Sequence, residues 1–126
     1  MKTTLCLIGL GGAAGSILRY LSSRFVAGKI DFLPGIWGTF AVNLVGCLLI
    51  GIVYGLSERY EWFSPQMRLF LATGFCGGYT TFSAFAYENV TLWQQGNYLV
   101  GFAYILISIA ACLLATFAGI AVTKII

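Results

Sequence analysis

The polar side chains in the apolar parts of this sequence suit the handling of an ion better than the breaking of bonds. The chain of 126 residues has no histidine, and its carboxylates, Asp31, Glu58, Glu61 and Glu88, lie outside the apolar segments or at their edges. Within those segments the candidates are hydroxyls, an amide, aromatic rings and freed backbone groups. Such groups can take the place of the water molecules that an ion loses when it leaves solution. We therefore expect a protein that is not an enzyme.

Metal chemistry of the usual protein kinds has little support. Without histidine and without a C-x-x-C pair, zinc and haem sites are not expected. One cysteine falls in each apolar segment: Cys6, Cys47, Cys76 and Cys112. We expect these four to be small, buried, apolar side chains.

Two sets of polar residues recur at helical spacing. Thr39 and Asn43 are one turn apart, and Tyr104, Ser108, Cys112 and Thr116 follow one another at intervals of four, which gives one slowly drifting stripe. Burying the Asn43 amide without a partner costs a few kcal/mol. Asn43 therefore either ties two helices together or faces a polar pathway.

The stretch from Gly74 to Phe85 is the most unusual part of the chain. It reads Gly-Phe-Cys-Gly-Gly-Tyr-Thr-Thr-Phe-Ser-Ala-Phe, with three glycines that each weaken a helix interior by about 1 kcal/mol. One interpretation is a helix that opens at Gly77–Thr80, where freed carbonyls bind a cation. Phe82 and Phe85 would then turn their positive ring edges toward a common point. The other interpretation is a helix crossing packed by glycines, with both phenylalanines in the core.

The elements that carry these residues are predicted to be membrane spans. The chain is 60% hydrophobic and only 9% charged, whereas soluble domains carry roughly 25% charge. Four apolar segments reach the length of about 20 residues that a bilayer requires, namely 3–26, 36–56, 67–93 and 98–122. We expect a single all-α integral-membrane domain (1–126). The small net charge of +3 gives no support to nucleic-acid binding.

The first segment leaves two questions open: whether it is a signal peptide or a retained span, and what its Arg19 does. Lys2, the following apolar run, and Ala13 and Ala14 resemble a signal peptide, but apolar character resumes at Ile17, which favours a retained span. Arg19 either reaches to the headgroups or lines a water-filled vestibule, where it would attract anions.

The distribution of cations predicts no firm orientation. Four spans place both termini on one side of the membrane. That side would hold Lys2, Arg59, Arg68 and Lys124, and the other Arg19, Arg24 and Lys29. Four against three is a weak bias. Such a chain could insert both ways and form an antiparallel dimer.

Several motifs resemble one known family. They are Gly12-Ala13-Ala14-Gly15 with Arg19-Tyr20, the run from Gly38 to Asn43, the run from Gly74 to Phe85, and Glu88. On these motifs, and over essentially its whole length, the chain resembles the Fluc/CrcB fluoride channels. The third motif is long and specific.

The resemblance implies a dual-topology, antiparallel homodimer in the cell inner membrane, with passive export of fluoride through two pores. Asn43, Phe82, Phe85, Thr39, Ser83, Tyr104, Ser108 and Thr116 would line the pores, and Arg19 their vestibule. The carbonyls of Gly77 and Thr80 from both chains would hold a structural Na⁺. Cys112 and Ala84 depart from the hydroxyls expected at these positions.

Two other classes remain as alternatives. A small multidrug-type exporter also has four spans, but it needs a carboxylate inside its first span for proton coupling, and no acid precedes Asp31 here. In a non-transporting assembly protein, the glycines would only pack helices.

Overall fold

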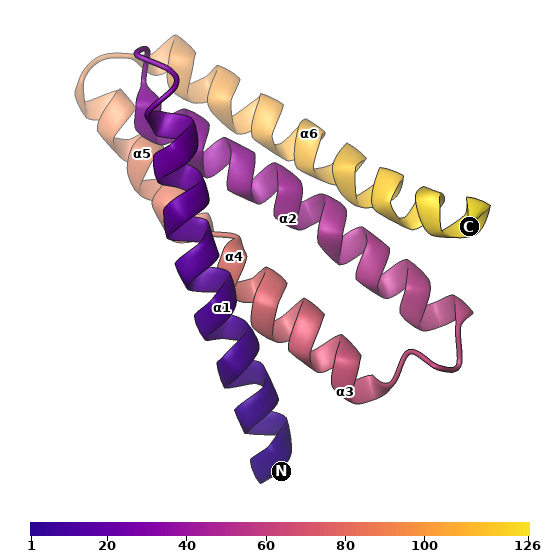
Figure 1. Cartoon of the computed structure of the whole chain (residues 1–126). Helices are drawn as coiled ribbons and strands as arrows, with labels where there is room; N and C mark the ends of the chain where they lie inside the picture. Colours follow the sequence, from indigo (N-terminus) through magenta and orange to yellow (C-terminus); the bar gives the residue numbers. More distant parts are fainter.

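The chain folds into helices alone, as the computed structural model of residues 1–126 shows (Figure 1). The elements are α1 (Lys2–Ala27), α2 (Pro34–Arg59), α3 (Pro65–Arg68), the π-helical segment η1 (Leu69–Cys76), α4 (Gly77–Tyr79), α5 (Phe82–Gln94) and α6 (Tyr98–Ile125). The prediction of an all-α protein is confirmed.

Three helices are long and apolar enough to cross a membrane. These are α1, α2 and α6, with 26, 26 and 28 residues, and they contain the expected segments 3–26, 36–56 and 98–122. The remaining expected span, 67–93, is divided among α3, η1, α4 and α5, with an extended interruption after Tyr79. The protein is therefore an all-helical, multi-pass membrane protein.

Local sequence signals explain the helix boundaries. Pro34 and Pro65 occupy the first turns of α2 and α3, where a missing backbone N–H is harmless. Ser64 and Thr81 cap α3 and α5, because their hydroxyls accept the N–H groups of Met67 and Ala84 at 3.2 Å each.

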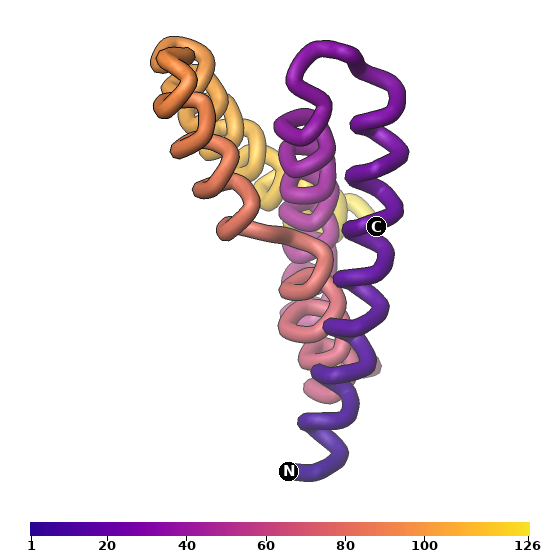
Figure 2. The backbone as a smooth tube through the Cα atoms, turned by 90° about the vertical axis from the view of Figure 1, so that its left-hand side faces the viewer, coloured from indigo at the N-terminus to yellow at the C-terminus, as the bar shows by residue number.

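Glycines allow the helices to approach closely. A Cβ atom added at Gly78 on α4 would overlap the backbone of Gly12 on α1, and one at Gly74 would lie 2.9 Å from the Ile8 carbonyl oxygen. α2 and α6 run side by side in the same direction (Figure 1) and are pinned by the Thr116 hydroxyl, which donates to the Cys47 carbonyl at 3.2 Å. Figure 2 shows α1 standing beside η1 and α4, with α5 and the start of α6 inclined away.

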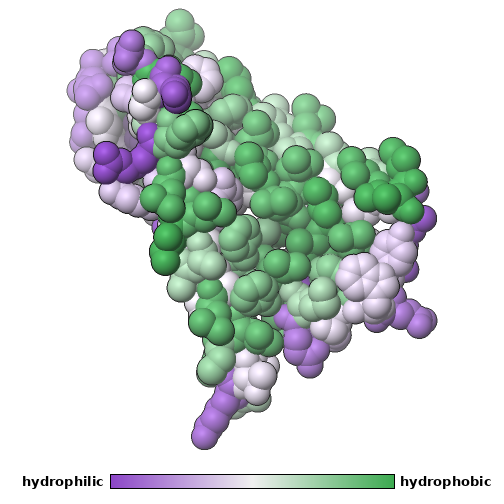
Figure 3. Space-filling model, viewed as in Figure 1, coloured by the Kyte–Doolittle hydropathy of each residue, from purple (hydrophilic) through white to green (hydrophobic).

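Much apolar surface is left uncovered by this packing. Only 21 of 126 residues are buried, and the accessible surface is 8022 Å², whereas a compact folded monomer of this mass exposes about 6,600 Å². Figure 3 shows a broad hydrophobic face with hydrophilic side chains gathered toward its extremities. Such a face must be covered by lipid or by another protein surface.

Candidate functional site

The backbone opens at two threonines within the glycine-rich stretch. Thr80 (φ −91°, ψ 160°) and Thr81 (φ −150°, ψ 118°) are extended, whereas Gly77 is helical at φ −61°, ψ −37°. The predicted opening is thus present, but it begins at Thr80 and not at the glycines. Gly78 serves the close approach to α1, so the opening and the glycine-packing interpretations each describe part of the stretch.

Side chains from two other helices bind the backbone groups of this interruption. Asn43 on α2 donates from Nδ2 to the Thr81 carbonyl at 3.0 Å and accepts the Thr81 N–H at 2.7 Å. Arg19 on α1 donates to the Thr80 carbonyl across 3.4 Å, a long contact. In a continuous helix the Thr81 N–H would donate to the Gly77 carbonyl. Because it donates to Asn43 instead, the Gly77 carbonyl loses its helical partner.

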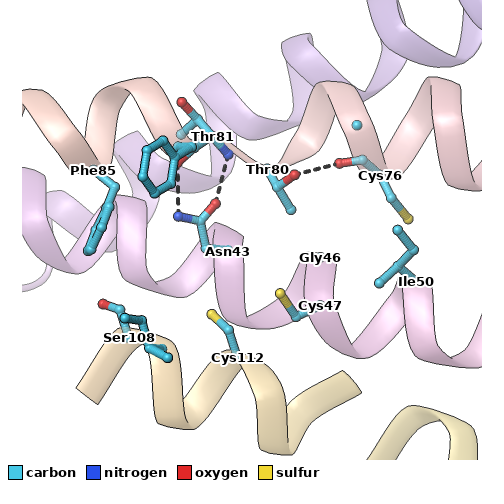
Figure 4. Close-up of a pocket in the computed structure, with 13 residues that line it drawn as sticks. Asn43, Gly46, Cys47, Ile50, Cys76, Thr80, Thr81, Phe85, Ser108 and Cys112 are labelled. Carbon is cyan, nitrogen blue, oxygen red and sulfur yellow. Dashed lines mark hydrogen bonds between the residues drawn. The ribbon is translucent and has the colours of Figure 1, made fainter. Parts of the chain in front are cut away.

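A cavity of about 320 Å³ lies beside the interruption, between α2, α6 and the segment that runs from the end of η1 through α4 into α5 (Figure 4). The residues predicted from the sequence that line it are Asn43, Gly77, Thr80, Phe82, Phe85, Ser108 and Cys112. No charged side chain lines this cavity. The structure therefore brings the phenylalanine pair, the amide and part of the fourth-segment stripe to one place.

Ser108 has the only unpaired hydroxyl among the buried side-chain oxygens of the chain. It is 8% exposed, and its Oγ has no hydrogen-bond partner although it lines the cavity. Asn43 Nδ2 also carries a second N–H beyond the one given to Thr81. Buried polar groups are normally paired, so the Ser108 hydroxyl indicates a place for an acceptor that the chain itself does not supply.

Phe82 and Phe85 line the cavity, Tyr104 packs against Phe85 outside the lining, and these rings are arranged edge to face or tilted. The ring centroids of Phe82 and Phe85 are 5.6 Å apart at 46°, and those of Phe85 and Tyr104 are 5.0 Å apart at 64°. Rings at such angles direct positive edges toward their neighbours and toward the space between them. Positive ring edges and hydrogen-bond donors are the groups that an anion would need in such a cavity.

A second cavity, of about 500 Å³, contains the other predicted residues of this region. Its lining includes Arg19, Thr39, Thr81 and Ser83, and Arg19 is its only charged residue. Thr81 lines both cavities. A space lined by one cationic side chain and several hydroxyls thus lies beside the first cavity, and the vestibule role of Arg19 stays a prediction.

Glu88 has a structural role that its sequence position at the end of an apolar segment does not predict. It was expected at the edge of its span, but its half-buried carboxylate accepts hydrogen bonds from Thr39 at 2.6 Å and Tyr104 at 2.8 Å. The carboxylate therefore joins α5 to α2 and α6. The signal for this was its spacing of three residues from Phe85, which makes these two side chains neighbours on the helix surface.

Thr116 and Asn89 both bond to backbone carbonyls. Thr116 lines neither cavity, since its hydroxyl donates to the carbonyls of Cys47 and Cys112. Asn89, 4% exposed, was overlooked; its amide donates to the Phe85 carbonyl at 2.9 Å. The cysteine prediction holds for Cys76 alone, because Cys6 is exposed and Cys47 and Cys112 are half-buried.

Long apolar helices, an interrupted apolar segment and a donor-lined cavity at the interruption together define a membrane protein of the channel or transporter class. The family model described as "CrcB-like protein, Camphor Resistance (CrcB)" matches residues 6–120. The chain belongs to this CrcB family.

Curated relatives extend this similarity over nearly the whole chain. A protein of Leptospira interrogans is 43% identical over 122 residues, covering 96% of this chain and 94% of its own length. One from Flavobacterium psychrophilum is 45% identical, covering 96% and 97%, and one from Bacteroides fragilis is 46% identical, covering 89% of each. All three are named "Fluoride-specific ion channel FluC". The family resemblance drawn from the motifs is confirmed.

Proposed function

We propose that this protein is a fluoride-selective channel, and not an enzyme, which lets fluoride leave the cell passively. The names of its relatives support the choice of ion. The observation within the structure that carries the proposal is the buried, unpaired Ser108 hydroxyl in a cavity free of charged side chains. A small anion that accepts hydrogen bonds would complete this arrangement.

The proposed route runs from the Arg19 cavity, past Thr81, into the cavity of Asn43 and Ser108. Arg19 raises the local concentration of anions at the entrance. Ser83 and Thr39 add hydroxyls there, and Phe82 and Phe85 supply ring edges further along, with Tyr104 packed behind Phe85. Donors set closely together can replace the water of a small anion but do not fit a larger one, which is the basis proposed for rejecting chloride. Thr116 has no place on this route.

Export in this scheme needs no energy source of its own. Fluoride enters a cell as neutral HF from an acidic medium and dissociates inside. A membrane potential that is negative inside then drives each anion outward by about 2.3 kcal/mol per 100 mV. The cell inner membrane is the location in which this gradient exists, and we place the protein there.

The working unit is proposed to be an antiparallel homodimer. Phe82 is 78% exposed in the single chain although it lines the cavity, so an aromatic ring of the proposed route lacks a cover. The nearly equal numbers of cations on the two expected sides allow both orientations. A second copy, inserted the other way, would cover this face. In each chain, the segment 67–93 would make the fourth crossing of the membrane.

A structural Na⁺ is proposed at the dimer axis. The residues present fit: Gly77 and Thr80 lie at the interruption beside the cavity, the Gly77 carbonyl has lost its helical donor, and the Thr80 carbonyl accepts only the long Arg19 contact. Carbonyl oxygens at an unwound helix are suitable ligands for Na⁺. Two chains would contribute four oxygens, and the ion would supply positive charge near the anion route.

The proposal is tested by ion release from liposomes that contain the purified protein. We expect rapid release of fluoride and negligible release of chloride. Equal release of both ions, or of neither, would rule out the selective channel. A drug-driven proton flux would support the exporter class instead, and a dimer that transports nothing would support the assembly protein.

A further inference from the structure

Two thiols face the candidate cavity at the contact between α2 and α6. Cys47 on α2 and Cys112 on α6 are free, half-buried and part of the cavity lining, and both point into the space between the helices (Figure 4). The Thr116 hydroxyl lies 3.2 Å from the Cys47 carbonyl oxygen and 3.1 Å from the Cys112 carbonyl oxygen. One hydroxyl thus holds the two cysteine backbones next to each other, and both side chains line the same cavity.

We infer that Cys47 and Cys112 form a binding site for one soft, thiophilic cation with two-coordinate geometry, of which Hg²⁺ is the representative, and that the bound ion obstructs the cavity. Thiolates are the protein ligands that soft metals prefer. On binding, each thiol gives its proton to solvent and two S–Hg bonds form, so that two protons are released for each ion.

The charge balance favours a divalent ion at this place. Two thiolates and Hg²⁺ make a neutral complex, and a neutral complex avoids the cost of a net charge in an apolar setting. Metals that require four protein ligands would lack enough of them at this site. No three His, Cys, Asp or Glu side chains come together as a metal-binding group anywhere in the chain. Cys76 lines the same cavity but is only 2% exposed, and it does not complete such a group.

The position of the pair gives the binding a functional consequence, which rests on the proposed fluoride route. Cys112 is one turn from Ser108, the residue with the unpaired hydroxyl, and both line the cavity. An ion held between Cys47 and Cys112 would occupy space in which the Ser108 hydroxyl and the Asn43 amide meet the anion. Fluoride release should therefore be blocked by Hg²⁺ and restored when dithiothreitol removes the metal.

The test measures metal binding and transport separately on the full-length chain. In a Cys6→Ser background, which removes the exposed thiol, Hg²⁺ is titrated by the ultraviolet absorbance of its thiolate bonds and by metal analysis after gel filtration. Fluoride release from liposomes is measured with and without Hg²⁺. The compared variants are Cys47→Ala, Cys112→Ser and, as the matched control from the same cavity, Cys76→Ala.

The expected result is one tightly held Hg²⁺ per chain in the background protein and in Cys76→Ala. Loss of a residue that only supports a metal ligand can weaken metal binding by up to about 100-fold. Removal of a ligand itself, Cys47 or Cys112, should therefore weaken Hg²⁺ binding at least that much. Both variants should also lose the block of fluoride release. Equal Hg²⁺ affinity in Cys47→Ala, Cys112→Ser and the background overturns the site.

The outcomes also separate this site from the proposed function. Binding that depends on both cysteines, in a protein that releases no fluoride, leaves the thiol site standing and removes the channel. Binding at the pair with undiminished fluoride release overturns the inference that the occupied site obstructs the route.

Discussion

The Asn43 side chain pairs with both backbone polar groups of Thr81, donating to its carbonyl at 3.0 Å and accepting its N–H at 2.7 Å. Where the helix is interrupted, this amide therefore replaces the partners that a continuous helix would provide. It also joins α2 to the junction between α4 and α5. Both sequence interpretations of Asn43 find support here, because it ties two elements together and also lines the cavity.

Replacing Asn43 should therefore lower both stability and transport. Asn43→Ala leaves the Thr81 N–H and carbonyl without partners, at a cost of about 1–3 kcal/mol for each group that stays dry. Asn43→Asp keeps an acceptor for the N–H but sets a negative charge beside the anion route. We expect reduced thermal stability in detergent for Asn43→Ala, and a deeper loss of fluoride release for Asn43→Asp. Parental values in both assays for both variants would show that the pairing is incidental.

The sequence was a good guide to features that depend on local pattern. The long apolar runs predicted the helices α1, α2 and α6 closely, because hydrophobic length alone determines them. The glycines and threonines between Gly74 and Thr81 predicted an opening near its true place. What local pattern could not distinguish was which residues open, since Gly78 is required for packing against Gly12 on another helix.

Features that depend on distant helices were less predictable. The stripe of residues at intervals of four rotates by about 40° at each step of a 3.6-residue helix. Tyr104 consequently reaches Glu88, Ser108 and Cys112 face the cavity, and Thr116 turns to the α2 backbone. The place of Glu88 depends on hydroxyls that lie 49 and 16 residues away, and no local pattern announces such partners.

The phenylalanine pair should be required for transport but not for assembly. Phe82→Ile and Phe85→Ile remove the ring edges and keep most of the apolar volume. We expect fluoride release to fall about tenfold or more in each, which corresponds to roughly 1.4 kcal/mol or more. Gel filtration and cross-linking should still report a dimer. Undiminished release in both variants would mean that the rings only pack.

Ser108→Ala separates a ligand role from a structural role. Since the Ser108 hydroxyl has no partner within the chain, its removal should not lower the thermal stability of the protein. Fluoride release should nevertheless fall, because the route loses a donor. The comparison variant is Ser57→Ala, in which a hydroxyl bonded to the Tyr54 carbonyl outside the cavities is lost. A loss of stability without a change in release would contradict the assignment.

The carboxylate of Glu88 should contribute to the packing of three helices. Hydrogen bonds to a charged group contribute about 1.5–3 kcal/mol each, and Glu88 accepts two. Glu88→Ala should therefore lower the unfolding temperature more than either Thr39→Val or Tyr104→Phe. In the double variant Glu88→Ala with Tyr104→Phe, the second change should add little, because its partner is already gone. Full additivity would show that the pair does not interact.

Replacement of a helical glycine by alanine should have opposite effects on stability at two positions that differ in their surroundings. Alanine favours a helix over glycine by about 1 kcal/mol. At Gly9 nothing lies within 4 Å of an added Cβ, so Gly9→Ala should preserve or raise stability. At Gly78 the added Cβ would overlap the Gly12 backbone, and Gly78→Ala should push α4 away from α1, lower the unfolding temperature and impair fluoride release. Equal unfolding temperatures for the two variants would show that Gly78 is not required for close contact between α4 and α1.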